Sequence, residues 1–214
     1  MPVRNSRLYP ILFGVLLAVV CATLLKTLDV ALGARIERNR TYDREKNVVL
    51  VLVGRETFAS MKPGQIGQTY KSCVHEVRQN PGAPIEYYRC ADPATKKTTA
   101  YVLPLEGMGL WDKVRGLMCL ETNLDTIRAV SFYDQAETPG LGGCIGEAAW
   151  AKRFDGKQIR NANGAVAITI TKAGTADAKD PNEVDGITAA TMTCNAVNKL
   201  MQVSIKRFLD EVKK

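Results

Sequence analysis

The chain has 214 residues, of which 46% are hydrophobic and 24% are charged, and its formal net charge is +7. The length suits one membrane anchor followed by one domain with a sizeable core. The 29 lysines and arginines are spread along the chain and do not alternate with aromatic residues, so nucleic-acid binding is not expected. Most of this charge is solvated surface, and part of it favours anionic lipid headgroups near the anchor.

Residues 9–25 carry no charge and are rich in Leu, Val and Ile, which predicts a membrane-spanning helix. At about 1.5 Å per residue this helix is roughly 26 Å long, slightly shorter than a hydrocarbon core of about 30 Å. Lys26 can reach the interface while residues 27–32 lengthen the apolar span. The alternative is a cleaved signal peptide, because Arg4 and Arg7 form a basic leading region. The lack of a small-x-small cleavage pattern favours a retained anchor.

The basic residues Arg4 and Arg7 also predict a cytoplasmic N-terminus, because basic flanks tend to remain on the cytoplasmic side. Arg35, Arg38 and Arg40 follow the span and weaken this prediction.

Charges of both signs in residues 33–60 predict a solvated helical stalk, with residues 48–53 forming either the end of that helix or a strand. The turn signal MKPG at 61–64 ends this pattern. We therefore divide the chain into a tail and transmembrane helix (1–32), a stalk (33–60) and one domain (61–214).

The domain is predicted to have an α+β fold, so that the whole chain is one transmembrane helix followed by a single α+β domain. Its final helix carries a core-facing apolar stripe of Val197, Met201, Ile205, Phe208 and Val212. The expected elements, in chain order, are a helix at 69–78, a loop at 80–84, a strand at 97–105, a hairpin of strands 114–120 and 126–133, a short helix at 147–154, a strand at 165–171, a polar loop at 172–185 and the helix at 191–212.

Histidine and cysteine usage argues against a metal site. His75 is the single histidine, and we interpret it as an ordinary surface or helix residue. The six cysteines form no Cys-x-x-Cys pair, so neither zinc nor an iron–sulfur cluster is expected. Cys73 and Cys90 could form a disulfide, but reduced, buried thiols are the default expectation.

The most informative segment is DGITAATMT (185–193), at the start of the last helix. An acidic residue opens a turn, small residues permit close backbone approach, and hydroxyl residues begin the helix. The first N–H groups of a helix lack internal partners, and the helix dipole favours negative charge there. The segment therefore predicts either a phosphate-binding site or an ordinary helix entered through a Ser or Thr cap.

Two other segments accompany it: GLW (109–111), before an apolar run, and ETPGLGG (137–143), a glycine-rich loop after an apolar strand. Together, in this order, the three segments resemble the FMN-binding domain of the C subunit of the sodium-translocating NADH:quinone reductase. The same domain occurs in the G subunit of the Rnf complex. The motif of that family is Asp, two variable residues, Ser/Thr, Gly/Ala, Ala, Thr, any residue, Ser/Thr. Ala189 stands where Gly is commoner, and Cys144 and Cys194 replace more usual polar residues.

The resemblance implies that Thr191 carries FMN through a phosphoester, formed when its hydroxyl attacks the pyrophosphate of FAD with help from a flavin transferase. It implies that Leu141 and Trp111 pack on opposite faces of the isoalloxazine ring. Composition alone leaves a core position for Trp111 equally open. The other residues that the resemblance places in the site are Glu137 and Thr138 near the polar edge of the ring, Gly140 and Gly142 in the glycine loop, and Asp185, Gly186, Thr188, Ala189, Ala190 and Thr193 around the attachment point.

By the same resemblance, the chain is an electron-relay subunit of a bacterial inner-membrane, sodium-pumping NADH:quinone reductase, with its flavin domain on the outer side and no catalytic residue of its own. Its expected partners are the other subunits, a flavin transferase and membrane lipid. Two alternatives remain: the G subunit of an Rnf ferredoxin:NAD+ oxidoreductase, and a membrane-tethered FMN-binding sensor or scaffold.

Overall fold

The computed structural model describes residues 8–213. The chain divides into two compact units, one ending at Asp43 and the other beginning at Arg44. The basic residues Arg4 and Arg7, on which the predicted orientation depends, lie outside the described residues.

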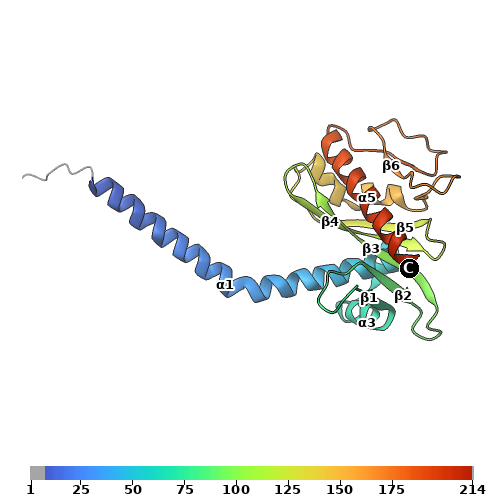
Figure 1. The fold of residues 1–214 in the computed structure, drawn as a ribbon, viewed down its shortest axis with the longest axis horizontal. Helices are drawn as coiled ribbons and strands as arrows, with labels where there is room; N and C mark the ends of the chain where they lie inside the picture. Colours follow the sequence, from blue (N-terminus) through green and yellow to red (C-terminus); the bar gives the residue numbers. More distant parts are fainter. Residues whose placement is uncertain (1–7, 214) are drawn as a thin grey trace, which may run out of the picture. The chain divides into compact units, whose positions relative to one another are not determined.

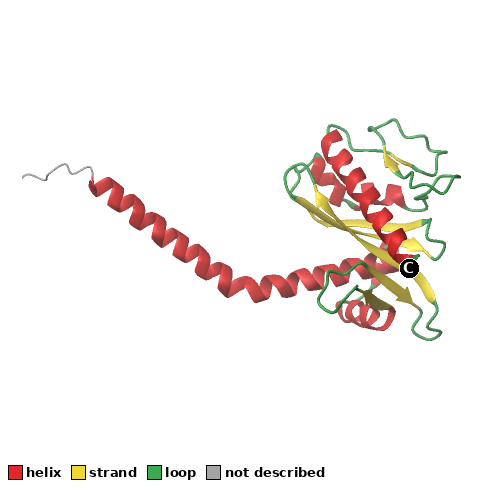
Figure 2. Ribbon diagram, in the orientation of Figure 1, coloured by secondary structure: helices red, strands yellow, loops and turns green. Residues whose placement is uncertain are grey.

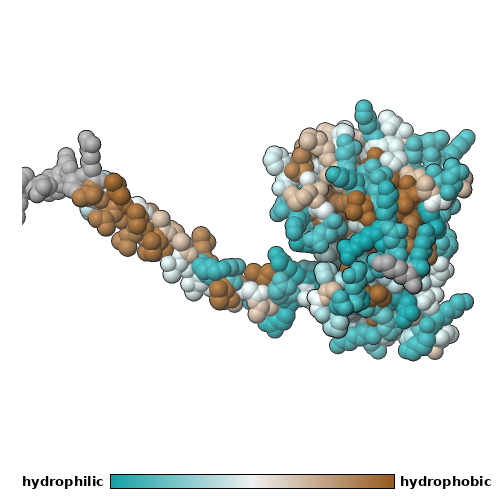
Figure 3. Space-filling model, viewed as in Figure 1, coloured by the Kyte–Doolittle hydropathy of each residue, from teal (hydrophilic) through white to brown (hydrophobic). Residues whose placement is uncertain are grey.

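The first unit consists of the N-terminal part of α1, a helix that spans Leu8–Val53 and contains the predicted anchor at 9–25. This part of the helix is long and apolar enough to cross a membrane, and its most apolar 18-residue window is not buried in the structure. Figure 3 shows the hydrophobic side chains along it. The hydroxyls of Thr23 and Thr27 donate to the carbonyls of Val19 and Thr23 at 2.7 Å, so both polar groups are satisfied within the helix. These features fit a single-pass membrane protein.

The end of α1 lies in the second unit, and residues 48–53 belong to this helix rather than to a strand. Gly54, with φ of +82°, ends it. Two helices follow, α2 (Arg55–Ser60) and α3 (Pro63–Cys73), with Pro63 at the start of α3. The boundaries expected after residues 32 and 60 stay predictions.

A five-stranded antiparallel sheet in the order β1-β2-β3-β4-β5 forms the centre of the second unit (Figure 1). The strands are β1 (Val74–Val77), β2 (Tyr87–Ala91), β3 (Thr98–Met108), β4 (Lys113–Glu121) and β5 (Ile127–Asp134). The predicted hairpin is correct: Leu117 lies opposite Ser131 in the β4–β5 register. Asn123 closes its turn by accepting the N–H groups of Asp125 and Thr126 at 3.0 Å.

Helices cover both faces of this sheet (Figure 2). The end of α1 and α3 pack on one face, where Val48, Ile66 and Cys119 are buried. The helix α5 (Thr191–Val212) packs on the other, in agreement with the predicted bounds of the last helix. Its stripe is buried as expected, except that Val212 is only partly buried. The sequence expectation of an α+β domain after one long apolar helix is confirmed.

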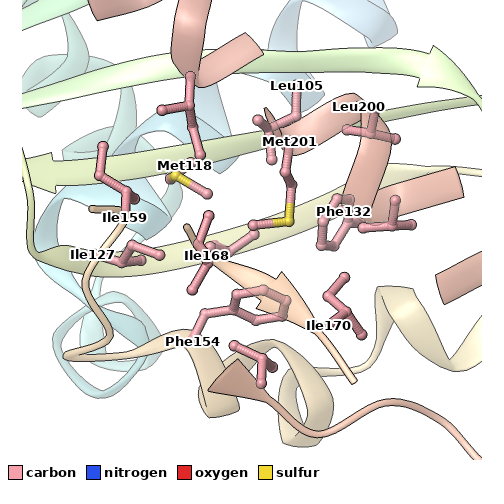
Figure 4. Packing of buried hydrophobic residues seen from close by; sticks show 14 of the residues in the cluster. Leu105, Met118, Ile127, Phe132, Phe154, Ile159, Ile168, Ile170, Leu200 and Met201 are labelled. Carbon is pink, nitrogen blue, oxygen red and sulfur yellow. The ribbon is translucent and has the colours of Figure 1, made fainter. Parts of the chain in front are cut away.

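The α5 face holds the larger core, which Figure 4 shows from close by. Its side chains come from the sheet, from α5 and from the segment between β5 and α5, and the labelled ones include Met118, Phe154, Ile168 and Met201. A Cβ atom on Gly107 would lie 2.8 Å from the Cβ of Leu200. The absence of a side chain at Gly107 therefore allows α5 to approach β3 closely.

Several predicted elements were wrong. The helix expected at 69–78 begins earlier, and its second half is β1, because Val74 to Val77 pair with β2. The strand expected at 165–171 shortens to β6 (Thr169–Ile170), which pairs in parallel with β7 (Glu183–Val184) inside the expected polar loop. The helix expected at 147–154 splits into α4 (Ala148–Ala151) and the 3-10 turn η2 (Lys152–Phe154).

All six cysteines are free, so Cys73 and Cys90 are not paired. Burial raises the pKa of the Cys90 thiol to about 12 and also raises the pKa of Cys119. These thiols are therefore protonated and inert at neutral pH. His75 lies exposed on β1 rather than on a helix, and no metal-binding cluster occurs among residues 8–213.

Candidate functional site

The turn between β3 and β4 carries the GLW segment. Gly109 donates its N–H to the carbonyl of Asp112 at 2.8 Å and closes the turn. The N–H groups of Leu110 and Trp111 then point at the Oε1 atom of Glu137, at 2.8 and 3.2 Å. The Trp111 side chain is 68% exposed. The alternative of a core tryptophan at this position is therefore wrong.

The glycine loop follows β5 and folds back on itself. The N–H groups of Leu141 and Gly143 donate to the carbonyl of Thr138 at 3.1 and 2.9 Å, and the 3-10 turn η1 (Gly142–Gly146) continues from there. Gly140 has φ of +74°, a conformation that L-residues with side chains rarely adopt. The loop is thus a defined turn that presents Leu141 at 40% exposure.

Asp185 anchors the third segment to the rest of the domain. Its Oδ1 atom accepts the N–H groups of Gly174 and Thr175 at 2.6 and 3.2 Å. Its carbonyl accepts the Nε1 of Trp150 at 3.0 Å and the Nη1 of Arg153 at 3.2 Å. Asp185 therefore shapes the segment from outside the cavity described below.

Small residues and one thiol form the entry to α5. Ala189 has φ of +59°, a left-handed conformation that glycine adopts without the strain that alanine has there. The N-cap is Ala190, which has no side-chain oxygen to cap the helix. The Sγ of Cys194 accepts the N–H of Ile187 at 3.4 Å, so the thiol serves as the hydrogen-bond acceptor that a polar side chain would otherwise provide. The alternative of an ordinary helix entered through a Ser or Thr cap is therefore wrong, and the first N–H groups of α5 are available to an anion.

The hydroxyl residues of this segment have different surroundings. Thr188 and Thr191 are exposed. Thr193 is only 2% exposed, and its hydroxyl donates to the Oε2 of Glu137 at 2.6 Å. Thr193 is therefore already engaged and inaccessible, while Thr191 stands at the first position of α5 with a free approach from solvent.

The three segments meet at one cavity of about 260 Å³. Around it lie exposed apolar side chains, among them Met192 at 65%. Exposed apolar side chains that gather at one place, rather than being scattered singly, can mark a binding site. The cavity is lined by Leu110, Thr138, Leu141, Gly142, Ala189, Ala190, Thr191, Met192 and Thr193.

Not every residue expected in the site lines this cavity. Trp111 stands beside Leu110 on the same turn, and Glu137 lies beneath the surface. Gly186 packs against the carbonyl of Thr171, away from the opening.

Four residues in or behind the site were not predicted from the sequence: Leu110, Met192, Trp150 and Arg153. Leu110 and Met192 could have been predicted as site residues, because each lies inside one of the three motifs. Trp150 and Arg153 lie outside all three motifs, and only the fold brings them to the carbonyl of Asp185.

The conformation of Ala189 predicts that glycine stabilises the fold. Removing the left-handed strain gains about 1–2 kcal/mol, and the greater freedom of unfolded glycine costs about 0.5–1 kcal/mol. Ala189→Gly should therefore raise the melting temperature by about 1–3 °C in detergent-solubilised protein. Ala196→Gly is the matched control, because Ala196 lies inside α5, where glycine costs about 1 kcal/mol relative to alanine and should lower the melting temperature. A lower melting temperature for Ala189→Gly would contradict the strain argument.

The part of the chain that contains these three segments is similar in sequence to known proteins. The sequence model of the FMN-binding domain matches residues 109–206, which begin with the GLW turn and end within α5. The C subunit of the Na(+)-translocating NADH-quinone reductase of Haemophilus ducreyi is 41% identical over 102 residues, 48% of this chain and 39% of that protein. Its counterpart from Vibrio alginolyticus is 32% identical over 132 residues, 62% of this chain and 50% of that protein. The matched part thus covers half or less of these relatives' length.

Solved structures give the same picture. Shewanella oneidensis NqrC superposes with a TM-score of 0.53 at 30% identity, over 59% of this chain and 60% of that one. The C subunit of the Na(+)-translocating NADH-quinone reductase from Parabacteroides distasonis reaches a TM-score of 0.69 at 20% identity, over 86% of this chain and 98% of that one, a likeness of fold. Residues 109–206 of this chain are thus similar in sequence to the FMN-binding domain.

Proposed function

We propose that the chain is an electron-transfer subunit of a membrane Na+-translocating NADH:quinone reductase, and that it carries FMN bound covalently through Thr191. The observation that carries this proposal is the position of Thr191. It is exposed at the uncapped start of a 22-residue helix, within the family's FMN-binding domain and on the wall of the cavity where the three motifs meet. The likeness to the C subunit of this reductase supports the choice of complex.

The residues present fit an FMN group in two ways. The first N–H groups of α5 and the positive end of its dipole suit a phosphate on Thr191. The exposed apolar side chains of Leu110, Trp111, Leu141 and Met192 suit a planar aromatic ring, which would cover them. When bound, FMN supplies reversible uptake and release of electrons at its isoalloxazine ring.

The roles of the protein's own residues follow from this fit. Thr191 provides the hydroxyl for the phosphoester, and the left-handed turn at Ala189 keeps that hydroxyl on the surface. Trp111 and Leu141 pack against the ring from the two loops that carry them. Gly140 and Gly142 keep the intervening backbone free of side chains, and Thr138 lies at the wall of the cavity. A tethered cofactor cannot diffuse away, which suits a relay between fixed redox centres of partner subunits.

Attachment needs a flavin transferase that reaches Thr191: the hydroxyl attacks the FMN-side phosphorus of FAD, the pyrophosphate bond breaks, and AMP leaves. The exposure of Thr191 supports such access, since both the hydroxyl and the neighbouring Met192 face solvent. The buried, hydrogen-bonded Thr193 is unsuitable as an acceptor. The subunit would not be a complete enzyme, because NADH oxidation and quinone reduction would occur in partner subunits.

The apolar part of α1 motivates a second part of the proposal, a single span in the bacterial inner membrane with the flavin domain outside the cytoplasm. A reporter that is active only outside the cytoplasm should therefore be active when fused after Lys214. A reporter that works only in the cytoplasm should be silent at the same position. Activity of the cytoplasmic reporter would overturn this orientation.

The exposed Trp111 gives a prediction for the ring environment. An indole stacked on the ring quenches flavin fluorescence, so Trp111→Leu should keep the flavin attached and make it markedly brighter, with a shifted absorption spectrum. Fluorescence of the purified protein, normalised to covalent flavin, measures this. Val203→Ala is the matched control, because Val203 is 60% exposed on α5 outside the cavity. Equal brightness of Trp111→Leu and the wild type would exclude stacking.

Purification from the native membrane separates this proposal from its alternatives. The reductase assignment predicts covalent flavin on this chain, together with NADH-dependent quinone reduction in the co-purifying subunits. A ferredoxin-linked set of subunits would favour the Rnf G subunit. Recovery of the flavin-bearing chain without any redox subunit would favour a tethered sensor or scaffold.

A further inference from the structure

Glu137 is a buried acid at the point where the three motifs meet. Its side chain is 5% exposed. One carboxylate oxygen accepts the N–H groups of Leu110 and Trp111, and the other accepts the hydroxyl of Thr193 at 2.6 Å. A residue of the glycine loop thus holds the β3–β4 turn with one oxygen and the first turn of α5 with the other.

The backbone of both neighbours is fitted closely around this carboxylate. A Cβ atom on Gly109 would lie 2.4 Å from the Oε1 of Glu137. A Cβ atom on Gly142 would lie 2.5 Å from the Thr193 hydroxyl and 3.0 Å from the Oε2 of Glu137. Gly109 therefore leaves room for the Oε1 of Glu137, and Gly142 leaves room for the contact between its Oε2 and Thr193. The resemblance, by contrast, explains the glycine loop by close approach to the ring.

The backbone of Glu137 is also fixed, because its N–H donates to the Oε1 of Gln135 at 2.6 Å. The N–H groups of Leu110 and Trp111 and the hydroxyl of Thr193 all donate to the carboxylate. An ionised carboxylate accepts hydrogen bonds at both oxygens and donates none, so it suits these three partners. In a buried position such bonds are costly to break, since the remaining partner is left unsatisfied. The three segments can therefore change their relative positions only by breaking these bonds.

We propose that Glu137 is a positioning residue: it holds the Trp111 turn in register with the attachment turn, and Thr193 is its partner on α5. This inference rests on the proposed function, because the register matters for a cofactor anchored at Thr191 and stacked on Trp111. It assigns Glu137 a place beneath the site rather than at the edge of the ring. It also gives Thr193 a role, that of holding Glu137, which is separate from the attachment of FMN at Thr191.

The two tryptophans of the chain make this testable without any flavin. Trp111 is exposed on the turn that Glu137 holds, and Trp150 is buried at 3% beside Asp185. In full-length protein labelled with 5-fluorotryptophan, Thr193→Val and Glu137→Ala should move the fluorine resonance of Trp111 toward its unfolded position. The Trp150 resonance should stay in place, which a general loss of structure would not allow.

Conservative variants separate positioning from packing. Thr193→Ser keeps the hydroxyl, and Glu137→Gln keeps an acceptor for Leu110 and Trp111, so both should retain the wild-type Trp111 resonance. Thr99→Val is the matched control: its hydroxyl donates to the carbonyl of Cys90 at 3.4 Å, far along β3 from the turn, and both resonances should be unchanged. If Glu137→Ala fails to fold, Thr193→Val carries the test.

The same variants are then loaded with flavin. Thr193→Val should keep covalent flavin but raise its fluorescence several-fold, because Trp111 no longer stays on the ring. Absence of flavin from the wild type would refute the proposed function. The positioning role of Glu137 would still be tested by the fluorine resonances, which are measured without flavin. A Trp111 resonance that is unmoved in both Thr193→Val and Glu137→Ala would overturn the inference. A shift of the Trp111 resonance in Thr193→Ser, which keeps the hydroxyl, would also overturn it.

Discussion

Thr191→Ala is expected to abolish covalent flavin while leaving the domain folded. The substitution removes the hydroxyl that would form the phosphoester. Thr191 is exposed at the first position of α5, and alanine is a good helix former, so the stability change should stay within about 0.5 kcal/mol. A denaturing gel viewed under ultraviolet light should show a fluorescent band for the wild type, co-expressed with a flavin transferase, and none for Thr191→Ala.

Three variants control this result. Thr191→Ser keeps a hydroxyl and should retain part of the attachment. Thr188→Ala removes the other exposed hydroxyl of the segment and should keep the fluorescent band. Thr193→Ala removes a hydroxyl already bonded to Glu137, so the band should also persist. A fluorescent band for Thr191→Ala, or its loss only in Thr188→Ala, would show that another residue carries the flavin.

The second large effect is expected for stability at Gly186. A Cβ atom there would lie 2.3 Å from the carbonyl oxygen of Thr171, and backbone of this kind cannot rotate out of the way. That clash would push apart β6 and β7, where the N–H of Thr171 donates to the carbonyl of Val184 at 2.9 Å. Overpacking that forces backbone shifts costs about 1–3 kcal/mol. Because this contact is with backbone rather than with a flexible side chain, Gly186→Ala should destabilise the domain by about 3 kcal/mol, at the upper end of that range.

Urea unfolding monitored by tryptophan fluorescence measures this effect, since Trp150 is bonded to the carbonyl of Asp185 next to Gly186. Gly67→Ala is the matched control, because Gly67 lies inside α3 with no atom near its would-be Cβ. There alanine should stabilise the helix by about 0.5–1 kcal/mol. Equal stability of Gly186→Ala and the wild type would mean that β6 and β7 can separate freely.

Periodic segments were predictable from the sequence. The last helix is found at Thr191–Val212 because an apolar stripe repeats every three to four residues over its whole length, and Val197 and Ile205 are fully buried. The β4–β5 hairpin was predictable because two apolar runs flank a turn. The resemblance to a flavin domain also rested on local features, the three short motifs and their order.

Elements that depend on distant partners were missed. The strand β1 follows α3 without a break and exists because β2 pairs with it, with His75 opposite Arg89. The strands β6 and β7 have two residues each and lie in polar sequence, so no period marks them. The buried contact between Glu137 and Thr193 could not be predicted either, because its two residues are far apart in the sequence. Only the fold brings Glu137 within 2.6 Å of Thr193, which is 56 residues away along the chain.

The central claim, that this chain holds FMN at the start of α5, is tested most directly by peptide mass spectrometry of the full-length protein produced with a flavin transferase. We expect a single flavin-bearing peptide, with fragment ions that place the FMN phosphoester on Thr191. Flavin mapped to Thr188 or Thr193, or a protein without covalent flavin although an active transferase is present, would contradict it.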